Sequence, residues 1–224
     1  MLFVLAAQVS AQQNEENNTP AFGLVYNTIL TTEILSGERV ESTVEDVLFS
    51  YNSAYSQGFG GFITFSPYQT FSFSTGITTI RRNYQVFMDA DSFDFERKLR
   101  VNSFQVPLLG VVNVQLGNNL WISGRGGFVL EFFPNNQLIE DERFLTVTQP
   151  RYWAIPTLRG GARLEYTTPK NGAFFIGASY TRSLTYLVRM YMDYSLANRT
   201  ITENFKLEGH YFSLDVGYVF ARKQ

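Results

Sequence analysis

The sequence of 224 residues contains no cysteine and a single histidine. The absence of cysteine excludes disulfides, thiolate nucleophiles and cysteine-ligated metals, as well as a lipoprotein anchor, which needs a cysteine behind its signal. A strong charge of one sign is also missing, because the net charge is −2 and charged residues make up only 17% of the chain. No basic field is therefore available to attract nucleic acid.

Long apolar runs are missing as well. No stretch approaches the roughly 18 apolar residues that a transmembrane helix requires. What the chain has instead is an aromatic content of 16% and 17 glycines. This composition is typical of a β-barrel, and the length suits one domain or at most two. If the protein resides in a membrane, strands must cross it.

The first residues have the pattern of an export signal. Leu2–Ala7 is a short apolar run, and Val9-Ser10-Ala11 has the small-x-small form of a signal-peptidase site. We therefore expect residues 1–11 to be a signal peptide, truncated at its start because a basic n-region is missing. Residues 12–20 are polar and are expected to form a flexible periplasmic leader, which leaves residues 21–224 for the barrel.

Eight segments alternate between apolar and polar residues, as strands with one apolar face do. The last is the clearest, because every second residue from Phe212 to Phe220 is apolar or aromatic. The predicted strands cover Phe22–Ile34, Gly58–Ser66, Thr70–Phe87, Val101–Leu116, Leu120–Phe133, Ala154–Thr167, Ala173–Met190 and Phe205–Phe220. No segment shows a sustained helical period.

The connections between these strands alternate in length. Three are tight turns rich in Pro, Gly and Asn, at residues 67–69, 117–119 and 168–172. The other four are longer and polar, and are predicted to be loops: Leu35–Gln57, Met88–Arg100, Pro134–Trp153 and Tyr191–Asn204. Short turns on one side and long loops on the other are typical of a bacterial outer-membrane barrel with both termini in the periplasm. The prediction is an all-β fold, an eight-stranded antiparallel up-and-down transmembrane β-barrel.

Aromatic residues gather near the short turns, where an outer-membrane barrel carries an aromatic girdle. The predicted girdle consists of Phe65, Tyr68, Phe71, Trp121, Tyr166, Phe174, Tyr218 and Phe220. A soluble lipocalin-like barrel would also alternate, but it would explain neither the girdle nor the unequal connections.

Five stretches carry a family resemblance: Phe71–Asn83, Phe104–Gln115, Gly124–Phe128, Ala178–Leu184 and Phe212–Phe220. Together they resemble the Bacteroidota outer-membrane β-barrel family, the PorT-like group of small barrels. The resemblance covers essentially the whole chain after the signal. It implies an outer-membrane barrel without catalytic residues, and one branch of the family is linked to the machinery that secretes adhesins and gliding components.

In the fifth and sixth predicted strands the charged residues fall on the polar face, which would line the barrel interior. Six charged residues form the predicted interior charge network: Arg125, Glu131, Arg159, Arg163, Glu165 and Asp215. The interior of an eight-stranded barrel is just wide enough to be filled by side chains, so we expect a structural plug of ion pairs. The alternative is that these charges line a narrow pore or a site for a small ligand.

Residues for catalysis are sparse. His210, the only histidine, is expected near the outer rim of the barrel. Ser213 lies three residues further along a strand and so faces the opposite side, which prevents a nucleophile–base pair within that strand. A lipid-modifying enzyme is therefore the least favoured function.

An acidic run could in principle hold calcium, since oxygen-rich loops suit that ion. It consists of Asp89, Asp91, Asp94 and Glu96. Arg97, Lys98 and Arg100 stand next to it, so a solvated, self-neutralising loop is expected instead. We predict no metal site, cofactor or catalytic residue.

The sequence therefore predicts a non-enzymatic outer-membrane protein. Its role would be structural or interactive, through long extracellular loops or as a subunit of an envelope complex. The expected surroundings are outer-membrane lipid and an envelope protein, around a barrel that is itself monomeric. A narrow pore or a small-ligand barrel is the alternative.

Overall fold

The computed structural model describes residues 20–36, 39–68, 70–90, 93–134, 136–141, 144–168, 172–196 and 199–221. The predicted signal peptide and nearly all of the predicted leader, residues 1–19, lie outside these ranges.

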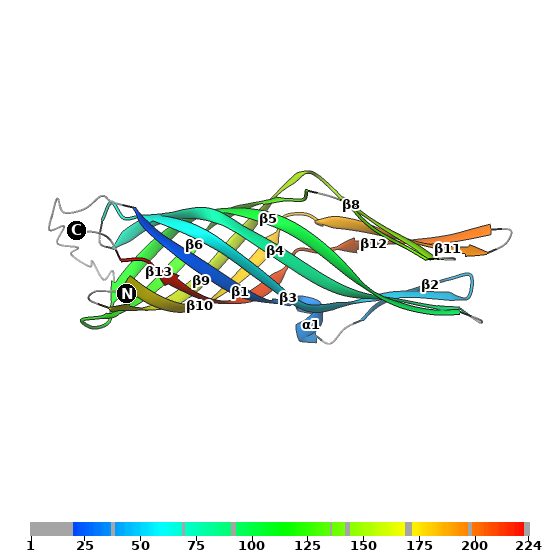
Figure 1. Ribbon diagram of the computed structural model, residues 1–224, viewed down its shortest axis with the longest axis horizontal. Coiled ribbons are helices and arrows are strands. Elements are labelled where there is room, and N and C mark those ends of the chain that lie inside the picture. Colours follow the sequence, from blue (N-terminus) through cyan, green and yellow to red (C-terminus); the bar gives the residue numbers. More distant parts are fainter. Residues whose placement is uncertain are drawn as a thin grey trace, which may run out of the picture.

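Eight antiparallel strands close into a barrel (Figure 1). Around the ring they are β1 (Ala21–Thr31), β13 (Tyr211–Val219), β10 (Gly172–Ser183), β9 (Ala154–Thr168), β6 (Leu120–Phe132), β5 (Phe93–Gln115), β4 (Phe71–Ala90) and β3 (Val47–Phe65). The ring is complete because β1 pairs with both β13 and β3. The predicted eight-stranded antiparallel barrel is confirmed, and its closure leaves no unpaired edge in the wall.

The short connections lie at the same end of the barrel as the start of β1 and the finish of β13 (Figure 1). At this end the backbone N–H of Phe220 donates to the carbonyl of Phe22 over 2.8 Å. The tight turn between β5 and β6 is held by the N–H of Leu116, which donates to the carbonyl of Leu120 over 2.9 Å. This end is called the short-turn end below.

At the opposite end, regions predicted to be long loops are largely strands, and the loop prediction is wrong there. The strand β5 has 23 residues, about 75 Å at ~3.3 Å per residue. A tilted strand needs only about 9–11 residues to cross a bilayer, so β3, β4 and β5 continue well past the barrel. The short strand β2 (Val40–Val44) pairs with the continued part of β3.

A second sheet faces this continuation (Figure 1). It consists of β12 (Arg199–Leu207), β11 (Val188–Leu196), β8 (Phe144–Pro150) and β7 (Gln137–Glu140), in that order. Two of the predicted strands are therefore each divided in two. The predicted strand Ala173–Met190 corresponds to β10 and the start of β11, and Phe205–Phe220 corresponds to the end of β12 and to β13. At the second break a Cβ on Gly209 would lie 2.7 Å from the Leu187 side chain, so a larger residue would force the buried Leu187 to shift.

The two sheets enclose an apolar core outside the barrel. Among its buried members are Phe49, Met88, Leu99, Met190 and Tyr194. We call this part, made of β2, the continued ends of β3–β5, β7, β8, β11 and β12, the sandwich. The sequence analysis did not predict the sandwich, because polar residues alternate with the apolar ones in these segments and make their composition similar to that of loops. Alternation with one face buried is the pattern of a strand.

One short helix, α1 (Thr32–Ser36), follows β1 where the strand was predicted to continue to Ile34. The Thr31 hydroxyl accepts a hydrogen bond from the N–H of Ile34 over 3.4 Å and so acts as an N-terminal cap. In the described ranges no helix has the length and apolarity needed to cross a membrane.

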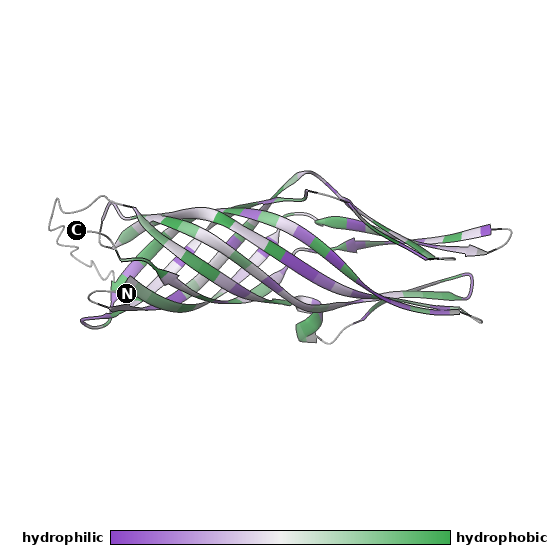
Figure 2. Ribbon diagram, in the orientation of Figure 1, coloured by the Kyte–Doolittle hydropathy of each residue, from purple (hydrophilic) through white to green (hydrophobic). Residues whose placement is uncertain are grey.

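The barrel wall is apolar outside and polar inside. Its outer surface exposes large apolar side chains such as Phe59 (59% exposed), Ile77 (61%) and Leu214 (54%). Charged Arg82 and Asp215 are buried inside. Hydrophobic and hydrophilic segments alternate along the strands of the wall in Figure 2. We call this apolar outer surface the belt; its polarity is the reverse of a water-soluble barrel.

Candidate functional site: the polar interior of the barrel

Alternation along each strand positions the interior side chains. In β6, Ser123, Val129 and Glu131 are buried, while their neighbours Ile122 and Phe128 are exposed on the belt. Gly124 and Gly126 of this strand lie on the outward face, between Ile122 and Phe128. Four arginines occupy the interior, each with its own partners.

The layer nearest the sandwich contains an ion pair between Arg82 of β4 and Glu131 of β6. Both side chains are buried, at 2% and 0% exposure. Arg82 also donates to Glu131 Oε2 over 3.2 Å and to the Ser103 hydroxyl over 3.0 Å. Gln105 Nε2 donates to Glu131 Oε2 over 2.9 Å. The carboxylate therefore has hydrogen bonds to both oxygens, as a buried charge requires.

The next layer is formed by Arg159, which has neutral partners. Its guanidinium donates to Gln105 Oε1 and to the Tyr211 hydroxyl, each over 2.6 Å, and to the Thr181 hydroxyl over 2.9 Å. Tyr211 also donates to Gln105 Oε1 over 3.1 Å. Gln105 thus connects the two layers, because its amide nitrogen donates to Glu131 and its amide oxygen accepts from Arg159.

Asp215 of β13 organises a third layer, in which Arg125 is its ion-pair partner. The carboxylate also accepts hydrogen bonds from Asn27 Nδ2 over 2.6 Å and from the hydroxyls of Ser213 and Ser179 over 2.8 and 3.1 Å. One buried carboxylate therefore ties together side chains from β1, β6, β10 and β13.

The layer nearest the short-turn end is the loosest. Arg163 lies 3.8 Å from Glu165, which is on the same strand. Its guanidinium also stands 3.8 Å from the centre of the Phe175 ring and 5.1 Å from that of Phe62. Aromatic faces therefore supply part of what stabilises this cation.

The six residues of the predicted charge network all lie on inward faces. They were expected to pair with one another, and only some of them do. Arg125 meets Asp215, and Arg163 meets Glu165. Glu131 pairs with Arg82, which the sequence interpretation missed, and in the described part of the chain Arg159 has no carboxylate partner. A signal for Arg82 was present, because adjacent Arg81 and Arg82 on one strand must face opposite sides.

The predicted girdle residues lie mostly on the outside near the short-turn end. Phe65, Tyr68, Tyr166, Phe174 and Phe220 are exposed. Phe71 and Tyr218 are half-buried, and the Tyr218 ring stands 4.8 Å from that of Phe174. Trp121 is different. It shares the inward face with Ser123 and Arg125 and does not belong to the outer surface, because a residue adjacent to outward Ile122 must face inward.

The remaining candidates do not assemble a reactive centre. His210 lies between β12 and β13, at the junction of barrel and sandwich and not at an outer rim, with its Nε2 3.3 Å from Glu208. Ser213 is buried and engaged with Ser179 and Asp215. In the acidic run, Asp89 faces Asp94 across β4 and β5, while Asp91 lies outside the described residues. No group of three metal-ligating side chains occurs in the described part of the chain.

No protein-family model matches the sequence. The comparison with curated proteins also finds no match. Solved structures do match. The outer membrane protein OprG from Pseudomonas aeruginosa is similar with a TM-score of 0.57 and 12% identity, over 92% of this chain and 98% of that one.

Two autotransporter domains match less well. The β-domain of BrkA from Bordetella has a TM-score of 0.40 and 9% identity, over 91% of this chain and 98% of that one. The translocator domain of NalP from Neisseria meningitidis has 0.37 and 14%, over 93% and 90%. Of these three, the OprG likeness alone is strong enough to support the fold, and its low identity limits it to the fold. The chain has the fold of an outer-membrane β-barrel with eight strands.

Proposed function

We propose that this protein resides in a bacterial outer membrane, with both termini on the periplasmic side. The observation that carries the proposal is the inverted polarity of the barrel. Ion pairs such as Arg82–Glu131 are buried inside, while Ile77, Phe128 and Leu214 are exposed outside. Water disfavours such a belt, whereas a hydrocarbon layer accommodates it. The short-turn end supports the periplasmic orientation, because outer-membrane barrels keep their short turns there.

The role that we propose is structural or interactive and not enzymatic. Two features favour it. The described interior is crossed by four arginines held by hydrogen bonds, ion pairs or aromatic rings, which favours a plugged barrel over a pore. The sandwich provides a folded body beyond the belt, with polar outer faces along β12 such as Thr202, Asn204 and Lys206. A folded body of this kind is a suitable surface for an envelope partner.

We also propose a family for this chain. We place the chain with the PorT-like barrels of the Bacteroidota on the five resembling stretches given above. The proposed partner is then another envelope protein, either of a secretion complex or of the surface layer, while the barrel itself is monomeric.

Location is tested by fractionating cells that express the full chain. The product should be recovered with outer membranes and should migrate differently in detergent gels before and after heating, because a closed barrel resists unfolding. Protease added to intact cells should cut the sandwich and spare the barrel. Recovery in the soluble periplasm, or a mobility that does not change on heating, would contradict the proposal. Co-purification from native membranes in mild detergent then tests for the partner.

A further inference from the structure

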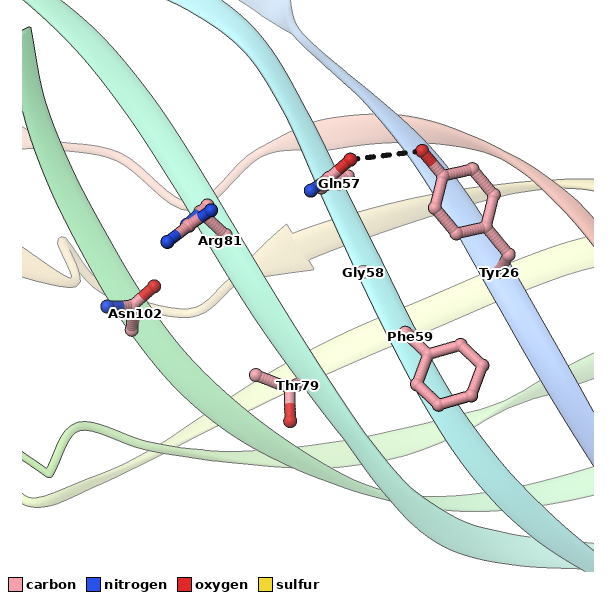
Figure 3. A pocket seen from close by; sticks show the side chains of 7 residues that line it. All are labelled: Tyr26, Gln57, Gly58, Phe59, Thr79, Arg81 and Asn102. Carbon is pink, nitrogen blue, oxygen red and sulfur yellow. Dashed lines mark hydrogen bonds between the residues drawn. The ribbon is translucent and has the colours of Figure 1, made fainter.

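The adjacent arginines of β4 divide between the two faces of the wall. Arg82 enters the interior, and Arg81 is exposed on the outer surface. Arg81 lines a shallow groove of about 260 Å³ in the outer wall (Figure 3). The groove is formed by four neighbouring strands, and its lining residues are Tyr26, Gln57, Gly58, Phe59, Thr79, Arg81 and Asn102.

The register of the strands places this groove at the boundary of the belt that is nearest the sandwich. Gln57, Arg81 and Asn102 stand side by side on β3, β4 and β5 and form a polar row. The next outward row toward the short-turn end contains Phe59, Thr79 and Phe104. Phe59 and Phe104 are exposed and belong to the belt. The groove therefore has an apolar wall on one side and hydrogen-bonding groups on the other.

Arg81 is the charged group of the groove, and its donors are available. Gln57 is already engaged, since its Oε1 accepts from the Tyr26 hydroxyl over 3.1 Å (Figure 3). Within the described ranges Arg81 has neither a hydrogen-bond nor an ion-pair partner, and it points away from the Tyr26–Gln57 pair. An arginine in this position can offer its planar fork of N–H donors to an oxyanion.

Two more cations continue from Arg81 toward the sandwich. Arg100 lies opposite Asn83, and Lys98 lies opposite Gln85. Both are exposed, and within the described part of the chain neither forms an ion pair. The nearest carboxylate in the outward row of β5 is Glu96, two residues beyond Lys98. The surface that follows the belt on β4 and β5 is therefore basic before it becomes acidic.

We propose that this groove binds the phosphate of an anionic membrane lipid in the leaflet on the sandwich side. Arg81 would bind the phosphate, with Asn102 beside it and Arg100 and Lys98 adding positive potential. The acyl chains would lie against Phe59 and Phe104. The inference rests on the proposed residence in a membrane, because only a bilayer presents a phosphate and hydrocarbon together at this height.

A free phosphate ion would use only half of the groove. It would find Arg81 exposed to water, where a single cation binds an anion weakly. A lipid adds the apolar contact, and the low dielectric of the headgroup boundary strengthens the charge interaction. The groove therefore suits the phosphate of a lipid better than a free phosphate ion.

The chain offers a matched control in Arg182 of β10. It is exposed on the outer face, opposite Leu158 of β9, and β10 is four positions from β4 around the ring. Arg182 is thus an exposed cation on the opposite side of the barrel, outside the groove. The substitutions Arg81→Gln and Arg182→Gln remove the same charge from two exposed sites.

The test is native mass spectrometry of the folded barrel released from detergent micelles, titrated with phosphatidic acid or with phosphatidylcholine. Heat-modifiable mobility is checked first. The wild-type protein and Arg182→Gln should retain one phosphatidic acid and prefer it to phosphatidylcholine. Arg81→Gln should bind phosphatidic acid about tenfold more weakly, as expected for the loss of a charge-assisted hydrogen bond. Inorganic phosphate at millimolar concentration should not displace the lipid.

Binding of phosphatidic acid that is weakened equally by Arg81→Gln and Arg182→Gln, or not weakened by Arg81→Gln, would contradict lipid binding at the groove. Displacement of the lipid by inorganic phosphate would overturn the lipid assignment and indicate a free-anion site. A wild-type chain that folds in micelles but shows no preference for phosphatidic acid contradicts this inference alone. A chain that never forms a heat-modifiable barrel contradicts the proposed function, and this inference with it.

Discussion

Arg82 of β4 and Glu131 of β6 form an ion pair that crosses over β5, with both side chains almost fully buried. The two strands are not neighbours in the ring, so the pair spans the inner surface of the strand between them. Ser103 and Gln105 of β5 donate to the same carboxylate. This arrangement stabilises the end of the barrel next to the sandwich.

Removing one partner of this pair should destabilise the barrel strongly. Arg82→Leu leaves Glu131 as a buried charge without a cation, at a cost of about 3–5 kcal/mol in the free energy of unfolding. The double change Arg82→Leu with Glu131→Leu should recover most of that loss. Urea unfolding of the protein in lipid vesicles, followed by tryptophan fluorescence, measures both.

The exposed pair Arg97–Asp141, with N···O 3.4 Å, is the control. Arg97→Ala should change the stability by less than ~1 kcal/mol, because water screens exposed pairs. Similar losses for Arg82→Leu and Arg97→Ala would mean that the interior pair is hydrated, contrary to a plugged barrel.

A charge on the belt should impair insertion. Phe128 is outward and exposed on β6, and Phe128→Arg should cost about 2–4 kcal/mol if its side chain lies near the middle of the bilayer. Thr202→Arg places the same charge on the exposed face of β12 in the sandwich and should have little effect. The fraction folded into vesicles, read from heat-modifiable mobility, compares the two. Equal folding of both variants would contradict the claim that the belt lies in the bilayer.

Much of the barrel follows from alternation alone. The inward and outward faces of β6 and β9 were predictable, because Leu130 and Glu131 or Leu158 and Arg159 differ so clearly in polarity. Outward Thr75 and Thr79 blurred the pattern of β4, and Arg82 was overlooked there. The choice of partners was not predictable, since Glu131 meets a residue 49 positions away. Only the register across three strands decides that contact.

The sandwich was not predicted for a different reason. Its strands alternate apolar residues such as Met190 and Met192 with polar ones, and charged residues cluster at their tips. Without a known partner sheet, the segments looked like solvated loops. Whether such a segment forms a strand depends on the opposite layer that buries it, which is a tertiary property.

The sandwich core should be separable from the barrel. Phe49 is fully buried in it, and Phe49→Ala should destabilise the sandwich by about 3–5 kcal/mol through the lost burial and the cavity left behind. Limited proteolysis of the folded variant should then cut the strands around the sandwich faster, while the heat-modifiable barrel persists. Loss of the barrel at the same time would show that the two parts fold as one unit.

The sandwich should also lose stability at alkaline pH. Burial raises the pKa of Tyr84 to about 12 and raises the pKa of Tyr51 beyond that range, because each phenolate would lose its hydration. In the unfolded chain both titrate near the ordinary value of 10.0. The folded state holds these protons more tightly, so their contribution to stability is complete below pH 10 and declines as pH rises above it.

Thermal unfolding of the sandwich between pH 9 and 12, with tyrosinate absorbance as the second readout, tests this pH dependence. The double variant Tyr51→Phe with Tyr84→Phe should decline less steeply over that interval. An unchanged slope would mean that neither phenol is kept neutral by burial.

Conductance of the purified wild-type protein in planar bilayers shows whether side chains close the interior of the membrane barrel. We expect insertion without steady conductance. We also expect that Arg163→Ala, which removes the guanidinium between Glu165 and Phe175, lowers stability without creating an ion-selective channel. Reproducible open channels in the wild-type protein, with an ion selectivity that changes in Arg163→Ala, would contradict the plug and establish a pore.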